Sequence, residues 1–255
     1  MPGSVHRWPA LCLAAITAAM LSACNAAGGG GAGTSPNNVL PPASQVENSL
    51  APQARFSPIN IYPGEVVGEP DIFRPHQGDT KDGGHGSRVD GIPCDKTEYL
   101  DDYHVHIYLG IVYEGKQISV PDAIGLIHPG RKVNGYISTA GCFYFIHTHD
   151  ASGMVHIEDP RDYPPTAVLY PFRDVLAVWG EKVAIDGFGP FKGLVRVFVG
   201  NVPKIGDLTV TSYSEIREPD LNSLMIHSHE AIWLVIGRPY VKASQLPSVT
   251  FYTEY

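Results

Sequence analysis

Apolar and polar positions alternate most clearly over residues 142–158, which read CFYFIHTHDASGMVHIE. Aromatic and β-branched residues run up to His149, four turn-forming residues follow, and a second alternating run leads back, so the pattern predicts a β-hairpin. Successive side chains of a strand point to opposite faces. A register that sets His147 opposite His156 then leaves His149 and Glu158 on the same face, and three imidazoles and a carboxylate converge there.

A second hairpin is predicted over residues 103–120, YHVHIYLGIVYEGKQISV, with a tight turn at Glu114 and Gly115. One face of its first strand is wholly apolar. The other face carries His104 and His106, so this strand repeats the pattern of an apolar face backed by histidines. The two histidine faces could meet each other or point outward.

Later segments complete the predicted fold. Residues 170–183 have apolar positions at spacings of three and four, which predicts one amphipathic helix that ends at Gly180. Residues 194–200 and 207–213 are expected to pair as strands, and residues 224–237 to form another strand on which His227 and His229 alternate.

The fold class expected is mainly β (α+β), with antiparallel sheets or sandwich-like hairpins and the one helix. We expect residues 56–255 to form a single compact unit, with a possible subdivision near residue 185.

The amino terminus has the layout of a secretory signal, because Arg7 precedes the apolar run LCLAAITAAM. The sequence LSAC that ends at Cys24 resembles the lipobox of bacterial lipoproteins. That resemblance implies cleavage after residue 23 and a diacylglycerol on the Cys24 sulfur. With Asn25 next, it implies the outer membrane, facing the periplasm. An ordinary signal peptide with a chance cysteine is the alternative. Residues 24–55 lack aromatic side chains and read as a flexible tether.

The chain is acidic, with a formal net charge of −8. Non-specific binding to nucleic acid or to anionic headgroups needs clustered Lys and Arg. We therefore expect no nucleic-acid partner, and membrane attachment only through the amino-terminal lipid.

Two of the four cysteines remain for the folded part. Cys12 leaves with the signal and Cys24 carries the lipid, so Cys94 and Cys142 are predicted to form a disulfide in an oxidising compartment. Paired thiolate metal ligands are the alternative.

From about residue 89 to residue 237 the chain resembles a family of exported bacterial domains. The matching strings are VDGIPC, HVHIYL, EGKQISVP, FRDVLAVWG, HEAIWLVIG and, above all, HTHD-x-SG-x-x-H-x-E within residues 147–158. The resemblance implies a shared fold and a shared histidine site, and it implies no particular activity. The chain departs from the pattern at Tyr108, where a small residue is expected, and at residues 207–223, where the segment is long. These departures affect the expected shape of the cavity more than the histidines.

Histidine is the commonest metal ligand in proteins, and two histidines one residue apart on a strand share a face. The candidate ligands are His104, His106, His147, His149, His156 and Glu158, with Asp150 and His229 as hydrogen-bonding supports. Nitrogen and carboxylate donors suit Zn, Fe, Mn or Cu(II).

Three interpretations of the histidines remain open. They could bind or transport a divalent transition metal, or serve a metal-dependent enzyme with an open coordination position and Glu158 as acid or base. They could also form a buried hydrogen-bonded layer in a structural or interaction lipoprotein. The residues leave the substrate and any protein partner undefined.

Overall fold

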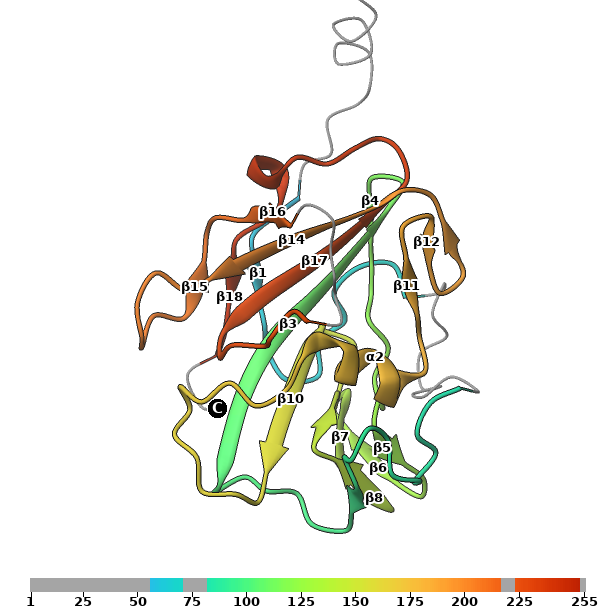
Figure 1. The fold of residues 1–255 in the computed structure, drawn as a ribbon, viewed down its shortest axis with the longest axis vertical. Helices are drawn as coiled ribbons and strands as arrows, with labels where there is room; N and C mark the ends of the chain where they lie inside the picture. Colours follow the sequence, from blue (N-terminus) through green and yellow to red (C-terminus); the bar gives the residue numbers. More distant parts are fainter. Residues whose placement is uncertain (1–55, 71–81, 217–222, 253–255) are drawn as a thin grey trace, which may run out of the picture. The chain divides into compact units, whose positions relative to one another are not determined.

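The computed structural model describes residues 56–70, 82–216 and 223–252, all of which belong to one compact unit (Figure 1). The predicted signal peptide, Cys24 and the tether lie outside the described residues. The fold is mainly β with a single α-helix among the described residues, as the sequence predicts.

A seven-stranded sheet forms the centre of the fold, in the order β16-β14-β17-β3-β10-β9, with β4 also paired to β3. All neighbours are antiparallel except β17 and β3, which run parallel. The strands are β3 (Tyr103–Tyr113), β4 (Lys116–Ile118), β9 (Ile146–His147), β10 (Met154–Asp159), β14 (Val195–Asn201), β16 (Ser214–Ile216) and β17 (Glu230–Ile236).

Smaller sheets surround this one, in the orders β1-β18-β15, β2-β8-β5, β11-β12-β13 and β6-β7. A 3-10 turn spans Ala243–Gln245. The remaining strands are β1 (Ile59–Asn60), β2 (Cys94–Asp95), β5 (Leu126–Ile127), β6 (Arg131–Val133), β7 (Tyr136–Thr139), β8 (Cys142–Tyr144), β11 (Val183–Ala184), β12 (Gly187–Phe188), β13 (Phe191–Lys192), β15 (Thr209–Val210) and β18 (Val249–Thr250).

The main core lies between one face of the central sheet and the helix α2 (Phe172–Trp179). Val105, Ile107 and Leu109 of β3 point into it, as their alternation predicts. The helix ends where expected, because Gly180 adopts the left-handed conformation (φ 83°) and its N–H bonds back to a carbonyl of the last turn.

Two strand predictions are wrong. The segment at 194–200 pairs with β16 and β17, whereas β15, which lies within 207–213, pairs with β18. In the segment 224–237, β17 begins only at Glu230, and His229 before it has φ 56°, which no extended strand accommodates. His227 and His229 therefore do not alternate along a strand.

Cys94 and Cys142 form a disulfide between the adjacent strands β2 and β8. Both cysteines are thus unavailable as thiolate ligands. Within the described ranges, no helix has the length and the hydropathy that a membrane crossing requires.

Candidate metal centre

The predicted pairing of His147 with His156 is confirmed, and β3 extends it into a row of three strands. Only β9 of the expected first hairpin strand pairs with β10, because Cys142–Tyr144 form β8 in another sheet. His156 of β10 lies opposite His147 of β9 on one side and His106 of β3 on the other. Glu158 lies opposite His104, and its N–H donates to the carbonyl of Phe145. The two histidine faces are one face of a single sheet. They converge because β3 and β10 are direct neighbours (Figure 1).

The tautomers of His147 and His149 follow from their backbone contacts. Nδ1 of His147 lies 2.8 Å from the carbonyl oxygen of Tyr144, and Nδ1 of His149 lies 2.6 Å from that of Ile137. A carbonyl only accepts, so each Nδ1 carries the proton and each Nε2 of the neutral ring presents a lone pair. The two Nε2 atoms are 2.9 Å apart. That spacing requires a proton or a metal ion between them.

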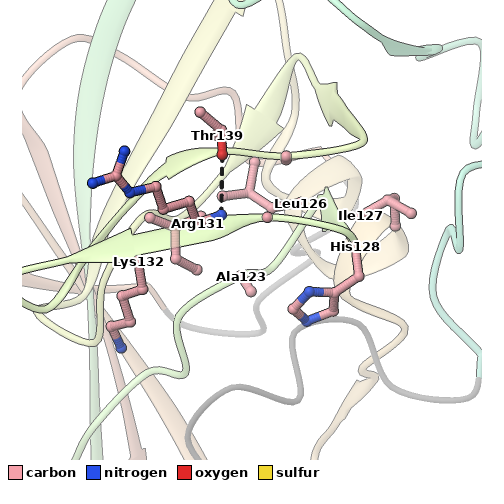
Figure 2. Close-up of a pocket in the computed structure, with 10 residues that line it drawn as sticks. Ala123, Leu126, Ile127, His128, Arg131, Lys132 and Thr139 are labelled. Atoms are coloured by element: carbon pink, nitrogen blue, oxygen red, sulfur yellow. Dashed lines mark hydrogen bonds between the residues drawn. The ribbon is translucent and has the colours of Figure 1, made fainter.

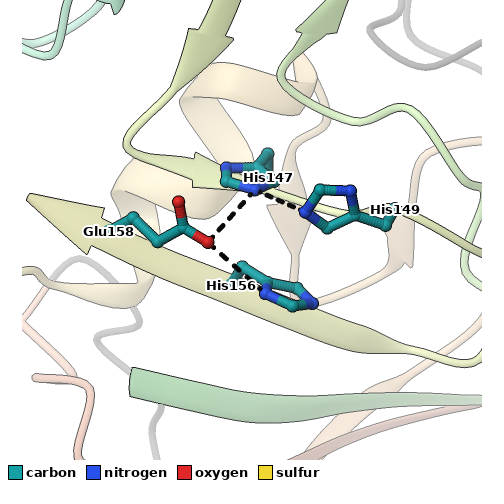
Figure 3. Close-up of side chains that lie close together, drawn as sticks. All are labelled: His147, His149, His156 and Glu158. Carbon is teal, nitrogen blue, oxygen red and sulfur yellow. Dashed lines mark hydrogen bonds and ion pairs between the residues drawn. The ribbon is translucent and has the colours of Figure 1, made fainter. Parts of the chain in front are cut away.

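Glu158 adds an acceptor to this cluster. Its Oε1 is buried, accepts no hydrogen bond from the described residues, and lies 3.6 Å from Nε2 of His147 and 3.3 Å from Nε2 of His104. Its Oε2 accepts the N–H of Tyr99. Burial, and then the neighbouring Glu98, raise the pKa of Glu158 to about 8. Figure 3 shows Glu158 and three histidines directed at one another.

The remaining histidines surround His156. Nδ1 of His156 is 3.1 Å from Nε2 of His106, 3.5 Å from Nε2 of His104 and 3.6 Å from Oε1 of Glu158. Burial holds the pKa values of His106, His147 and His156 well below the usual range, and neighbouring imidazoles lower them further. These three rings are therefore neutral at pH 7, the state in which imidazole binds a metal.

Sequence reasoning missed Glu98. Its Oε1 lies 3.0 Å from Nε2 of His149 and 3.9 Å from Nε2 of His147. The loop that carries Glu98 follows β2, and the disulfide ties Cys94 of β2 to the strand that precedes the histidines. The predicted disulfide was the available signal, because it places the residues after Cys94 near the segment that carries the histidines.

Asp150 and His229, which were expected to support the metal ligands by hydrogen bonds, make other contacts. Asp150 accepts the N–H of Gly64 on one carboxylate oxygen and that of Ser152 on the other, so its hydrogen bonds hold the turn. His229 donates its backbone N–H to the carbonyl of His106, and its ring packs at 4.9 Å from the ring of Phe251.

The donor atoms are close enough together for a metal site. One donor each from His147, His149, His156 and Glu158 lies within 4.8 Å of the others, and the same holds for His104, His106 and His156. Ligand atoms about 2.1 Å from one ion lie at most ~4.2 Å apart, and ~3.4 Å apart in a tetrahedral site. Several of the distances above fall near the tetrahedral value.

A small pocket of about 120 Å³ lies beside the cluster, among β5, β6 and β7 (Figure 2). Leu126 and Ile137 line it with apolar side chains, and Arg131, Lys132 and His128 also border it. Ile137 belongs to both sites, because its carbonyl accepts the proton of His149.

Comparison of the chain with protein-family models, with curated proteins and with solved structures finds no significant match. The resemblance to exported bacterial domains therefore stays a prediction, and functional conclusions rest on the geometry of the cluster.

Proposed function

We propose that this chain is a lipid-anchored domain of the cell envelope that binds a divalent transition metal in its histidine cluster. The observation that carries the proposal is that three atoms with lone pairs lie close together. Nε2 of His147, Nε2 of His149 and Oε1 of Glu158 face one another in a buried space. One proton can serve one pair of these atoms, whereas metal coordination can satisfy all three.

The electrostatics favour a metal ion over extra protons. Burial disfavours a charged imidazole at His147 and, in the absence of a cation, an ionised carboxylate at Glu158. A bound cation reverses the second effect, because it stabilises the carboxylate directly. The nitrogen and oxygen donors suit Zn, Cu(II), Fe or Mn.

The proposed location in the cell envelope rests on the amino terminus and on the cysteines. The LSAC sequence supports lipid attachment at Cys24, and the disulfide between Cys94 and Cys142 suits an oxidising compartment such as the periplasm. Attachment to the outer membrane is part of the same proposal. Mass spectrometry of the amino-terminal peptide tests it, and an unmodified Cys24 would contradict it.

Elemental analysis of the full chain, purified in detergent without an affinity tag, tests metal binding. We expect stoichiometric metal in the wild type and none in the His147→Ala/His156→Ala variant, provided circular dichroism shows that the variant is folded. The matched control is His128→Ala/His227→Ala, which removes two exposed histidines. If the wild type stays metal-free after exposure to Zn, Cu, Fe and Mn, the cluster is a hydrogen-bonded layer.

A further inference from the structure

The cluster holds more donors than one ion uses. Transition-metal ions in proteins take about four to six ligands. Seven side chains converge here, all with ring nitrogens or carboxylate oxygens within 4 Å of another member: His104, His106, His147, His149, His156, Glu98 and Glu158. One ion would leave some of these donors uncoordinated, so the distances among them decide whether a second ion can bind.

Three donors form a first triangle. Nε2 of His104, Nδ1 of His156 and Oε1 of Glu158 are separated by 3.3, 3.5 and 3.6 Å. These edges match the ~3.4 Å expected between donors that surround one ion at about 2.1 Å in tetrahedral geometry. Two imidazoles and one carboxylate form a ligand set that leaves coordination positions open for water or another ligand.

Three other donors form a second triangle. Nε2 of His147, Nε2 of His149 and Oε1 of Glu98 are separated by 2.9, 3.0 and 3.9 Å. Adjacent donors of a six-coordinate ion lie ~3.0 Å apart at the same bond length, so two edges match this geometry and the third is wider. The composition is again two imidazoles and one carboxylate. Each divalent ion would therefore be coordinated by one negatively charged carboxylate.

The triangles share no atom and lie side by side. The edge between them runs from Nε2 of His147 to Oε1 of Glu158, at 3.6 Å. Two-metal sites in proteins hold their ions about 3.5–4 Å apart, often with a carboxylate at the shared edge. We propose that the cluster binds two divalent ions, one held by His104, His156 and Glu158 and the other by His147, His149 and Glu98.

This inference rests on the proposed metal-binding function, and zinc stoichiometry separates the two. The full chain is dialysed against zinc chloride, and bound zinc is measured by elemental analysis. We expect two zinc ions per wild-type chain and one per Glu98→Gln chain. The control Glu65→Gln removes an exposed carboxylate outside the cluster and should keep two. His104→Gln, which alters the other triangle, should also bind one.

Each result decides a different claim. One zinc per wild-type chain, lost only when the central histidines are removed, would overturn the two-ion proposal and leave metal binding intact. Two ions retained in Glu98→Gln would overturn the assignment of the second position. Binding of none of zinc, copper, iron and manganese in the same assay would contradict both the inference and the proposed function.

A spectroscopic measurement on the wild type does not depend on how the variants fold. Two Mn²⁺ ions at the expected separation are magnetically coupled, so the full chain loaded with manganese should show the broad electron paramagnetic resonance spectrum of a coupled pair. An isolated six-line spectrum at full loading would contradict the two-ion proposal.

Discussion

The first half of strand β3 has two faces that are both largely buried but differ in chemistry. Beyond His106 the histidine face also becomes apolar, with Tyr108 and Val112 in a second core. Ile107 is 0% exposed in the apolar core, and His106, one residue earlier, is 2% exposed in the histidine cluster. Exposure to water therefore does not explain why one face is polar. A buried imidazole has to be compensated by hydrogen bonds or by a cation. The apolar face packs in the core and stabilises the fold, whereas the histidine face is the one that the proposed metal ion would occupy.

Truncation on the apolar face should have the largest effect. Ile107→Ala removes a fully buried side chain and should lower the free energy of unfolding by about 2–5 kcal/mol in urea titrations. Zinc bound per folded chain should not change, because the substitution leaves every donor in place. If Ile107→Ala abolished zinc binding in a chain that stays folded, zinc binding would depend on the apolar face as well as on the histidine face.

Opening the disulfide should affect both faces. Cys94 and Cys142 are 48 residues apart, and Cys94→Ala/Cys142→Ala should lower the free energy of unfolding by about 2–4 kcal/mol. The loop that carries Glu98 directly follows the strand that contains Cys94, so zinc affinity should also fall.

Calorimetry of the zinc-free chain measures the first effect, and competition with a zinc chelator measures the second. The serine double variant is the control for the change in side-chain shape. Unaltered zinc affinity would show that the remaining contacts of the loop hold Glu98 in place.

A carboxylate substitution on the histidine face should change affinity more than stability. Glu158→Gln replaces a donor and should weaken zinc binding at least about tenfold. The zinc-free chain should be no less stable, because the variant buries a neutral amide in place of an ionisable group.

Glu230→Gln is the matched control, since Glu230 is as buried as Glu158 but lies at the start of β17, outside the cluster. Its zinc affinity should equal that of the wild type. Equal losses in both variants would mean that burial of the carboxylate, and not its place in the cluster, determines the effect.

Local alternation was enough to predict much of the fold and of the cluster. The register of His147 with His156, the apolar face of β3 and the helix end at Gly180 follow from patterns within single segments. Contacts between segments far apart in the sequence could not be predicted from such local patterns. The neighbours of β14 and the approach of Glu98 depend on strand order, which no single segment specifies.

The third histidine pair shows a related limit. The alternation of His227 and His229 continues the apolar run of β17, but the pairing with β3 begins at Glu230, and His229 lies in a turn. Periodicity predicts that a strand exists more reliably than where it begins.

The smallest expected effect concerns a carboxylate on the apolar side. Asp174 of α2 is buried, and its Oδ1 lies 3.5 Å from Nε of the exposed Arg173. Burial raises the pKa of Asp174 above its usual 3.8. The folded chain then holds this proton more tightly than the unfolded chain, so the contribution of Asp174 to stability falls as the pH rises from about 3.8 through the raised pKa.

Asp174→Asn should remove this pH dependence. Near pH ~3.5 the neutral Asp174 and the amide should give similar stabilities, whereas near pH ~6 the variant should be the more stable, because the wild type then buries a charged carboxylate. Urea titrations at both pH values measure the difference, and Asp162→Asn, at an exposed position, should show none. A wild type more stable than Asp174→Asn near pH ~6 would show that the charge at the first turn of the helix outweighs its burial. In that case a buried carboxylate paired only with the exposed Arg173 is tolerated on the apolar side, and the burial of Glu158 would by itself be weaker evidence for a cation.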